Sequence, residues 1–327
     1  MPSADQMKAL LKSHIDGDDA QFYAVAMQVA AHEAKLGHGK LAQELRSLID
    51  EAKLRHNSFE SANKSVPLAQ PRGELANLLT LSYPKLRIPD MILGRDIRER
   101  LTRVIKEHRQ ITKIRSFGLA PRKKLLFVGP PGTGKTMSAG VLAGELNLPL
   151  FSVRLDSLIT KFMGETAAKL RQIFDAIAQV RGVYLFDEFD SIGSNRSILN
   201  EVGEIRRVLN SFLQLIEQDE SNSLLLAATN HPEILDSALF RRFDDVIEYR
   251  LPDRDLLAQA IQANLAAFKK IDVYWPQLAD VAVGLSYADI TRACNDALKD
   301  AIINDRDHVT NDDILKTLSE RKTIQGK

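Results

Sequence analysis

Cysteine is nearly absent from the sequence: Cys294 is the only one among 327 residues. A single thiol excludes an intramolecular disulfide and a zinc site built from several thiolates. Glycine (17 residues) and proline (12 residues) are also scarcer than in average proteins. The hydrophobic fraction of 44% is enough to fill buried cores. Together these features exclude disordered, collagen-like and linker-dominated chains.

An excess of either charge is also missing. The 44 lysines and arginines almost balance the 43 aspartates and glutamates, which leaves a formal net charge of +1. A protein that binds nucleic acid mainly through phosphates usually carries a basic excess. We therefore do not expect nucleic acid as a partner, although a global count leaves a local basic patch open.

Long apolar runs do not occur either. The sequence has no stretch of 18 apolar residues, and its first residues lack the basic and then apolar pattern of a secretory signal. We therefore expect a cytoplasmic protein with no membrane partner.

The length predicts about two domains, with room for a small third. In residues 1–55, apolar residues recur at helical spacing in three stretches, which indicates a small helical N-terminal bundle. The sequence that follows is polar and loses this periodicity, so we expect residues 56–84 to form a linker.

Strand-like and helix-like patterns alternate in residues 85–252. Four short apolar runs are typical of fully buried strands: 125–128, 150–153, 183–186 and 224–227. Helical patterns near 136–146, 166–180 and 203–218 separate these runs. The alternation predicts an α/β fold with a parallel sheet covered by helices on both faces. Residues 253–327 show only helical patterns, so we expect an all-helical unit after the sheet.

A phosphate-binding pattern follows the first buried strand. Residues 129–136 match G-x-x-x-x-G-K-[ST], and a helical pattern comes directly after them. The glycines let backbone N–H groups curl around phosphate oxygens, and the helix N-terminus adds a favourable dipole. We expect Lys135 to reach the β- and γ-phosphates of ATP and the Thr136 hydroxyl to ligate Mg²⁺. The candidate nucleotide-binding residues of this loop are Gly129, Pro130, Pro131, Gly132, Thr133, Gly134, Lys135 and Thr136.

Polar side chains end two other buried strands. Asp187 and Glu188 follow the run 183–186, and Asn230 follows the run that starts at Leu224. In open α/β folds, ligands bind at the carboxyl ends of the strands. Asp187 therefore suits a Mg²⁺ partner, and Glu188 suits the group that polarises an attacking water. Asn230 suits a hydrogen bond to the γ-phosphate or to that water.

The phosphate loop, the acidic pair and Asn230 follow one another in an order that also occurs in a known family. The sequence GPPGTGKT, the strand that ends in Asp187-Glu188, and Asn230 with residues 236–244 resemble the AAA+ ATPases. The stretch 230–244 resembles the second region of homology that marks the AAA proper branch. The resemblance covers residues 85–320 and implies a RecA-like α/β domain followed by a helical lid, with ATP and Mg²⁺ bound between them.

The resemblance also implies that neighbouring copies complete the site. Arg242, directly before Phe243-Asp244, is similar to the arginine finger that relatives insert into the next subunit's site. Guanidinium suits this role because it stays charged and bridges phosphate oxygens. Many relatives carry a second arginine three residues later, where this chain has Asp245, and Arg241 is open as a substitute. We expect a homo-oligomer, and specifically a hexamer.

Two further segments are similar to nucleotide contacts of the family. Ile92 belongs to a segment that resembles the one lying against adenine. Residues 284–290 resemble the lid motif G-x-S-G-A-D-[IL], in which Ala288 is expected near the adenine and ribose. Tyr287 stands where that motif has glycine, and Arg292 follows nearby.

Residues 161–165, with the sequence KFMGE, resemble the loop that lines the central pore of family hexamers. The resemblance implies pore-loop residues Lys161, Phe162, Met163 and Gly164. Phe162 would hold a polypeptide, and Gly164 would supply mobility. The alternative is that Phe162 and Met163 anchor the loop to the protein core.

The combined expectation is an ATPase that unfolds, threads or remodels a protein. The N-terminal bundle would select the substrate or adaptor, in an architecture that resembles spastin, katanin and small bacterial single-module AAA proteins. Some of the bacterial proteins act beside a partner protease, whereas this sequence has no H-E-x-x-H protease motif. Two alternatives stay open, a nucleic-acid motor or loader and a slow ATPase switch that acts through its assembly state.

Overall fold

The computed structural model describes most of the chain. The described residues are 19–35, 38–39, 42–47, 71, 73–158, 163–189, 202–234, 237–266, 271–306 and 308–325. The chain divides into two compact units, Met1–Leu68 and Ala69–Lys327.

The first unit is helical where it is described. Helix α2 spans Asp19–Lys35, and residues 42–47 are also helical. Val29 and Ala30 are buried, as the apolar stripe of this segment predicts. The first predicted helix and most of the predicted linker lie outside the described residues.

The second unit is built on one mixed sheet. Its six strands follow the spatial order β1-β3-β4-β5-β2-β6, and all neighbours are parallel except β1 and β3. The strands are β1 (Leu79–Ser82), β2 (Lys124–Val128), β3 (Leu150–Val153), β4 (Val183–Phe186), β5 (Leu224–Thr229) and β6 (Asp245–Glu248). The predicted α/β fold and its four buried strands are confirmed.

Both edge strands were missed by the sequence analysis. Residues 75–78 form helix α4 and residues 79–82 form β1, although the sequence predicts a linker as far as residue 84. Only one of the four β1 residues is buried, and in β6 likewise only Ile247 is buried. All six β5 residues are buried. Edge strands therefore lack the continuous apolar run that reveals central strands.

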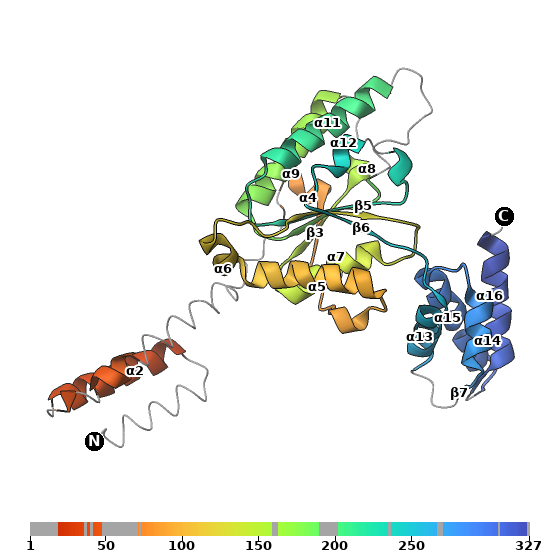
Figure 1. The fold of residues 1–327 in the computed structure, drawn as a ribbon, viewed down its shortest axis with the longest axis horizontal. Helices are drawn as coiled ribbons and strands as arrows, with labels where there is room; N and C mark the ends of the chain where they lie inside the picture. The colour runs from red at the N-terminus through yellow and green to blue at the C-terminus, as the bar shows by residue number, and fades with distance from the viewer. Residues whose placement is uncertain are drawn as a thin grey trace. The chain divides into compact units, whose positions relative to one another are not determined.

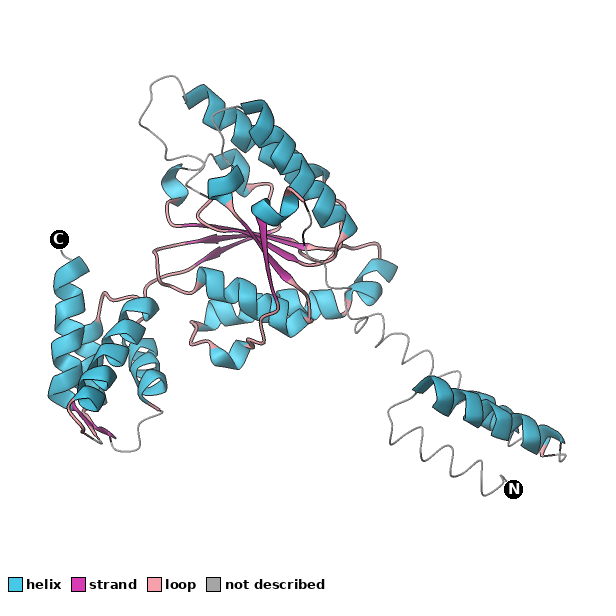
Figure 2. Ribbon diagram, turned by 180° about the vertical axis from the view of Figure 1, so that it is seen from behind, coloured by secondary structure: helices cyan, strands magenta, loops and turns pink. Residues whose placement is uncertain are grey.

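Helices cover both faces of the sheet (Figures 1 and 2). Helices α5 and α7 lie against one face, and α9 and α11 lie against the other (Figure 1). The longer helices are α5 (Arg95–Arg109), α7 (Lys135–Leu146), α9 (Met163–Gln179) and α11 (Val202–Gln218). Short segments connect them: α6 (Ile111–Ser116), α8 (Leu155–Leu158), α12 (Ser237–Phe240) and the 3-10 turns η1 (Ile88–Asp90) and η2 (Pro232–Ile234).

Strand β2 shows how the sheet separates two cores. Leu125 and Phe127 belong to the core beneath α5 and α7, whereas Leu126 and Val128 belong to the core beneath α9 and α11. Successive side chains of a strand point to opposite faces, so an unbroken apolar run fills both cores. The strand that leads into the predicted phosphate loop is therefore held firmly on both sides.

The C-terminal part of this unit forms a third core. Its helices are α13 (Arg254–Leu265), α14 (Trp275–Ala282), α15 (Tyr287–Ile303) and α16 (Asn311–Gln325). The predicted helical character of residues 253–327 is confirmed, but the unit is not all-helical: β7 (Ile271–Asp272) and β8 (Val309–Thr310) form a short parallel pair. Burial raises the pKa of the Cys294 thiol to about 12, so this residue is an inert core side chain. Among the described residues, no helix is long and apolar enough to cross a bilayer.

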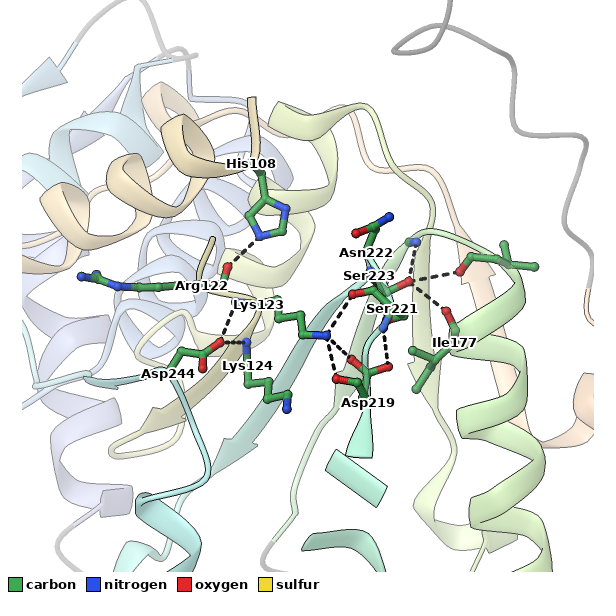
Figure 3. Close-up of polar contacts among 12 residues, drawn as sticks. His108, Arg122, Lys123, Lys124, Ile177, Asp219, Ser221, Asn222, Ser223 and Asp244 are labelled. Atoms are coloured by element: carbon green, nitrogen blue, oxygen red, sulfur yellow. Dashed lines mark hydrogen bonds and ion pairs between the residues drawn. The ribbon is translucent and has the colours of Figure 1, made fainter. Parts of the chain in front are cut away.

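Polar contacts link neighbouring segments at the amino ends of the central strands (Figure 3). The Lys123 ammonium donates to the Asp219 carboxylate at 2.8 Å and to two backbone carbonyls, those of Asp219 and Ser221. One Asp244 carboxylate oxygen accepts the backbone N–H groups of Lys123 and Lys124. These contacts hold the start of β2 to the end of α11 and to the start of β6.

Candidate nucleotide-binding site

The predicted phosphate loop leaves β2 at Gly129 and enters α7 at Lys135. Gly129, Gly132 and Gly134 have φ angles of 142°, 75° and 101°, a region that favours glycine. A Cβ on Gly129 would lie 2.0 Å from the Tyr249 carbonyl oxygen, and one on Gly132 would lie 2.4 Å from the Ser286 Oγ. Both the backbone conformation and the surrounding atoms therefore require glycine in this loop.

Lys135 lies inside the loop rather than in solvent. Its side chain donates to the carbonyl oxygens of Gly129 at 2.7 Å and Pro130 at 2.8 Å, and to the Asn230 Oδ1 at 2.8 Å. The Pro130 carbonyl also accepts the Thr133 hydroxyl at 2.8 Å. These contacts hold the ammonium at the carboxyl ends of β2 and β5, where a phosphate would meet it.

Thr136 and Asp187 form a pair of oxygen donors. The Thr136 hydroxyl donates to the Asp187 carboxylate at 2.6 Å. Hydroxyl and carboxylate oxygens suit Mg²⁺, which binds through few protein groups and keeps several waters. The donor chemistry of this pair therefore fits the predicted metal role.

Glu188 has an unusual backbone. Its φ angle is 50°, and its N–H donates to the Asp187 Oδ1 at 2.9 Å. Non-glycine residues seldom adopt this left-handed conformation, and it often occurs at functional positions. The turn after β4 thereby points an exposed carboxylate into the cavity that contains Lys135.

A cavity of about 530 Å³ brings the predicted phosphate-site residues together. Its lining comprises Pro131, Gly132, Gly134, Lys135, Thr136, Met137, Asp187, Glu188, Asn230, Tyr287, Ala288, Thr291 and Arg292. The α15 residues come from the helical part of the unit, and the Ala288 N–H donates to the Gly132 carbonyl at 3.2 Å. The site therefore lies between the sheet and the lid helices.

A second cavity of about 380 Å³ shares part of this lining. It is lined by Asp90, Met91, Ile92, Thr133, Gly134, Met137, Ala260, Ala263, Asn264, Tyr287 and Thr291. Of the predicted residues, Ile92 lines this cavity and Ala288 lines the first one, whereas Gly129 and Pro130 line neither.

Three lining residues were missed by the sequence analysis: Met137, Asn264 and Thr291. Only Thr291 had a usable signal, because it lies one helical turn after Tyr287.

Tyr287 contributes to the lining of both cavities. Burial, and secondly the charge of Asp253, raise the pKa of its phenol to about 12. The expected lid motif has glycine at this position, so Tyr287 adds an aromatic side chain to the lining of both cavities.

Arg242 does not line either cavity. It precedes β6, which runs parallel to β2 with Leu125 opposite Asp245. Its guanidinium contacts the Glu217 carboxylate near the end of α11. Arg242 therefore lies at the amino ends of the strands, opposite the phosphate loop, and the adjacent Arg241 is more exposed.

The predicted pore loop is described only in part. Lys161 and Phe162 lie outside the described residues, and Met163 and Gly164 form the start of helix α9. Their role stays a prediction.

Comparisons with known proteins identify the family. The model of the AAA family, "ATPase family associated with various cellular activities", matches residues 125–251. An uncharacterized AAA family ATPase, y4kL of Sinorhizobium fredii, is 35% identical over 322 residues, which cover 98% of this chain and 96% of y4kL.

Two other similar proteins match over a smaller share of this chain. The ATP-dependent zinc metalloprotease FtsH of Helicobacter felis is 32% identical over 235 residues, which cover 69% of this chain but 37% of FtsH. The crystal structure of the FIGL-1 AAA domain matches with a TM-score of 0.60 and 24% identity, over 74% of this chain and 85% of that chain. This structural match shows the fold alone. With the full-length match to y4kL, these findings show that the chain belongs to the AAA family of ATPases.

Proposed function

We propose that this AAA ATPase works as a hexamer that uses ATP hydrolysis to unfold, thread or remodel a protein. The observation that carries the proposal is the separation of Arg242 from the phosphate loop of its own chain. Between them runs strand β2, whose five residues span about 13 Å at the usual rise per residue. An arginine finger at Arg242 would therefore act on the ATP of a neighbouring copy.

Each side chain in the cavity has a chemical role in this proposal. Lys135 binds the β- and γ-phosphates once ATP replaces its carbonyl partners, and Asn230 orients the γ-phosphate or the attacking water. Glu188 polarises that water by accepting a hydrogen bond from one of its O–H groups. Thr136 and Asp187 would hold Mg²⁺, which neutralises the negative charge of the phosphates when it is bound.

The second cavity has the size and the lining expected for the nucleoside. Met91, Ile92 and Met137 supply apolar surface, and Asn264 supplies an amide. Apolar walls with a few polar groups are typical of small-molecule sites. We therefore place the base here and the phosphates in the neighbouring cavity.

The protein substrate is supported by two observations. FtsH proteins, named as ATP-dependent metalloproteases, match 69% of this chain. Residues 161–164 resemble a pore loop in which Phe162 contacts the polypeptide. The N-terminal unit would recruit the substrate or an adaptor. These 327 residues contain no H-E-x-x-H motif, so they hold no zinc-protease site of that type themselves.

Mixing two inactive variants tests the shared site. Lys135→Ala removes phosphate binding but leaves Arg242 intact. Arg242→Ala removes the arginine finger but leaves the phosphate loop intact. Each variant alone should lose most ATPase activity, whereas their mixture should recover part of it, because some contacts join an intact loop to an intact arginine. Arg254→Ala, which removes an exposed arginine paired with Asp280, is the matched control. A mixture as inactive as its components would contradict an arginine that acts between copies.

Substrate class needs its own measurement. ATP turnover should rise with added casein, an unfolded protein, and this rise should disappear in Phe162→Ala but persist in Tyr274→Ala, an exposed aromatic of the lid. Stimulation by single-stranded DNA alone would instead indicate a nucleic-acid motor. Turnover that responds to neither probe but changes with assembly state would indicate an ATPase switch.

A further inference from the structure

Tyr249, which directly follows β6, contacts both ends of the phosphate loop. At the start of the loop, its backbone N–H donates to the Val128 carbonyl at 2.7 Å, and its own carbonyl oxygen occupies the space that a Cβ on Gly129 would need. At the end of the loop, its hydroxyl donates to the Ser138 Oγ at 2.7 Å. Ser138 belongs to the first turn of α7, and both side chains are fully buried.

The Ser138 hydroxyl extends this contact into the loop. Its Oγ donates to the Gly134 carbonyl at 3.0 Å, and its backbone N–H donates to the same oxygen at 2.9 Å. The Met91 thioether lies 3.8 Å from the Oγ, but sulfur is a weaker acceptor than a carbonyl. Helical serines often donate to the carbonyl four residues earlier. Here a second hydroxyl, that of Tyr249, donates to the serine oxygen and so fixes the direction of its proton.

The Gly134 carbonyl in turn sets the direction of the Lys135 N–H. The two groups belong to one planar trans peptide and point in opposite directions. The carbonyl is held toward the body of α7, so the N–H points out of the helix N-terminus, the end at which a helix attracts anions. Fixing this peptide therefore aims the N–H at the position proposed for the phosphates.

We propose that Ser138 and Tyr249 are positioning residues for nucleotide binding. Tyr249 orients the Ser138 hydroxyl, and Ser138 holds the peptide between Gly134 and Lys135 in the orientation that binds phosphate. Neither Ser138 nor Tyr249 lines either of the two cavities, so both act through the loop. The inference rests on the proposed phosphate role of residues 129–136 and names the buried contacts that prepare the loop for it.

Titration of the full chain with ADP and Mg²⁺ measures the effect. Ser138→Ala removes one of the two hydrogen bonds to the Gly134 carbonyl, so ADP should bind about 3- to 10-fold more weakly, the factor that corresponds to one neutral hydrogen bond. Tyr249→Phe keeps the serine hydroxyl but removes its orienting partner, so its affinity should lie between those of Ser138→Ala and the wild type. In ATPase assays the KM should rise while the turnover number stays within about twofold, because the loop holds ATP before and during the reaction.

The double variant distinguishes positioning from stability. Ser138→Ala leaves the Tyr249 hydroxyl buried without its acceptor, which should lower the free energy of unfolding in urea. Adding Tyr249→Phe removes that hydroxyl, so part of the stability should return. The ADP affinity should not return, because Tyr249 acts through Ser138.

Two matched controls lose a buried hydroxyl away from the phosphate loop. The Ser223 Oγ donates to the Ile177 carbonyl at 3.1 Å, and the Tyr184 hydroxyl donates to the Val180 carbonyl at 2.9 Å. Ser223→Ala and Tyr184→Phe should lose stability but bind ADP as the wild type does.

Lys135→Ala shows whether the loop binds phosphate at all. If Lys135→Ala loses ADP binding while Ser138→Ala binds ADP as the wild type does, this inference is wrong and the proposed phosphate site stands. An ADP affinity that returns with stability in the double variant would also overturn the inference, because the pair would then be a packing contact. Wild-type ADP affinity in Lys135→Ala would overturn the proposed phosphate site itself.

Discussion

The Lys135 ammonium and the Asn230 Oδ1 lie 2.8 Å apart, although 95 positions separate them in the chain. The pairing of β2 with β5 explains this proximity. Val128 lies opposite Thr229, so the phosphate loop and Asn230 leave adjacent parallel strands at the same edge. The amide thus positions the ammonium before any phosphate is present.

Asn230→Ala should slow ATP hydrolysis more than it weakens ATP binding. In the proposed role, the substitution removes a hydrogen bond to the charged γ-phosphate or to the attacking water, an interaction worth about 1.5–3 kcal/mol. The turnover number should therefore fall about 10- to 100-fold. Steady-state ATPase assays and nucleotide titration separate the two effects. Asn222→Ala, at the other end of β5, serves as the control, and an unchanged turnover number in Asn230→Ala would contradict the role.

Much of the phosphate site was predictable because it depends on local patterns. The glycines of residues 129–136 and the buried strand before them are contiguous in the sequence. The topology rule for parallel strands then placed Asp187, Glu188 and Asn230 at the same edge. Each of these inferences needs only the element type and the chain direction.

The parts that were missed depend on tertiary packing. Asn264 lines a cavity only because α13 packs near the phosphate loop, and no motif marks that position. The contact between Arg242 and Glu217 requires the end of α11 to meet the turn before β6. Strand β1 has too few buried residues to distinguish it from a linker.

Gly129→Ala should destabilise the fold. The new Cβ would lie 2.0 Å from the Tyr249 carbonyl oxygen, which belongs to backbone next to β6 and has little freedom to move. With the strain of φ 142° added, we expect a loss of about 3 kcal/mol or more in the free energy of unfolding. Gly284→Ala separates the two causes, because its φ is 94° but no atom lies within 4 Å of its Cβ. Equal losses in the two variants, measured by chemical denaturation, would exclude the collision as the cause.

Lys123→Met should also lower the free energy of unfolding, because it leaves a buried carboxylate without its cation. The Asp219 side chain is only 3% exposed and would lose its cation, a change that usually costs about 3–5 kcal/mol. Adding Asp219→Asn should restore part of the loss, because it removes the stranded charge. Arg254→Met breaks the exposed pair with Asp280 and should cost at most about 1 kcal/mol. Urea denaturation compares the variants, and a failure of the double variant to recover would argue against an electrostatic cause.

His108 should make stability depend on pH. Its Nε2 lies 2.7 Å from the Arg122 carbonyl, and its Nδ1 is buried with no partner among the described residues. Burial is the main cause that lowers its pKa below the usual value of about 6.5, with a smaller effect from the charge of Arg181. The unfolded chain therefore binds more protons in this range, so stability should be full above about pH 6.5 and should fall as the pH decreases toward the folded-state pKa.

Replacing His108 by Gln tests this titration, since the amide retains a donor for the Arg122 carbonyl. Urea denaturation at pH 7, 6 and 5 should show a smaller loss of stability for His108→Gln than for the wild-type chain. His231→Gln is the control, because His231 is exposed and pairs with Glu233. It should retain the wild-type slope. If His108→Gln lost as much stability as the wild type over this range, the acid sensitivity would have to come from other groups.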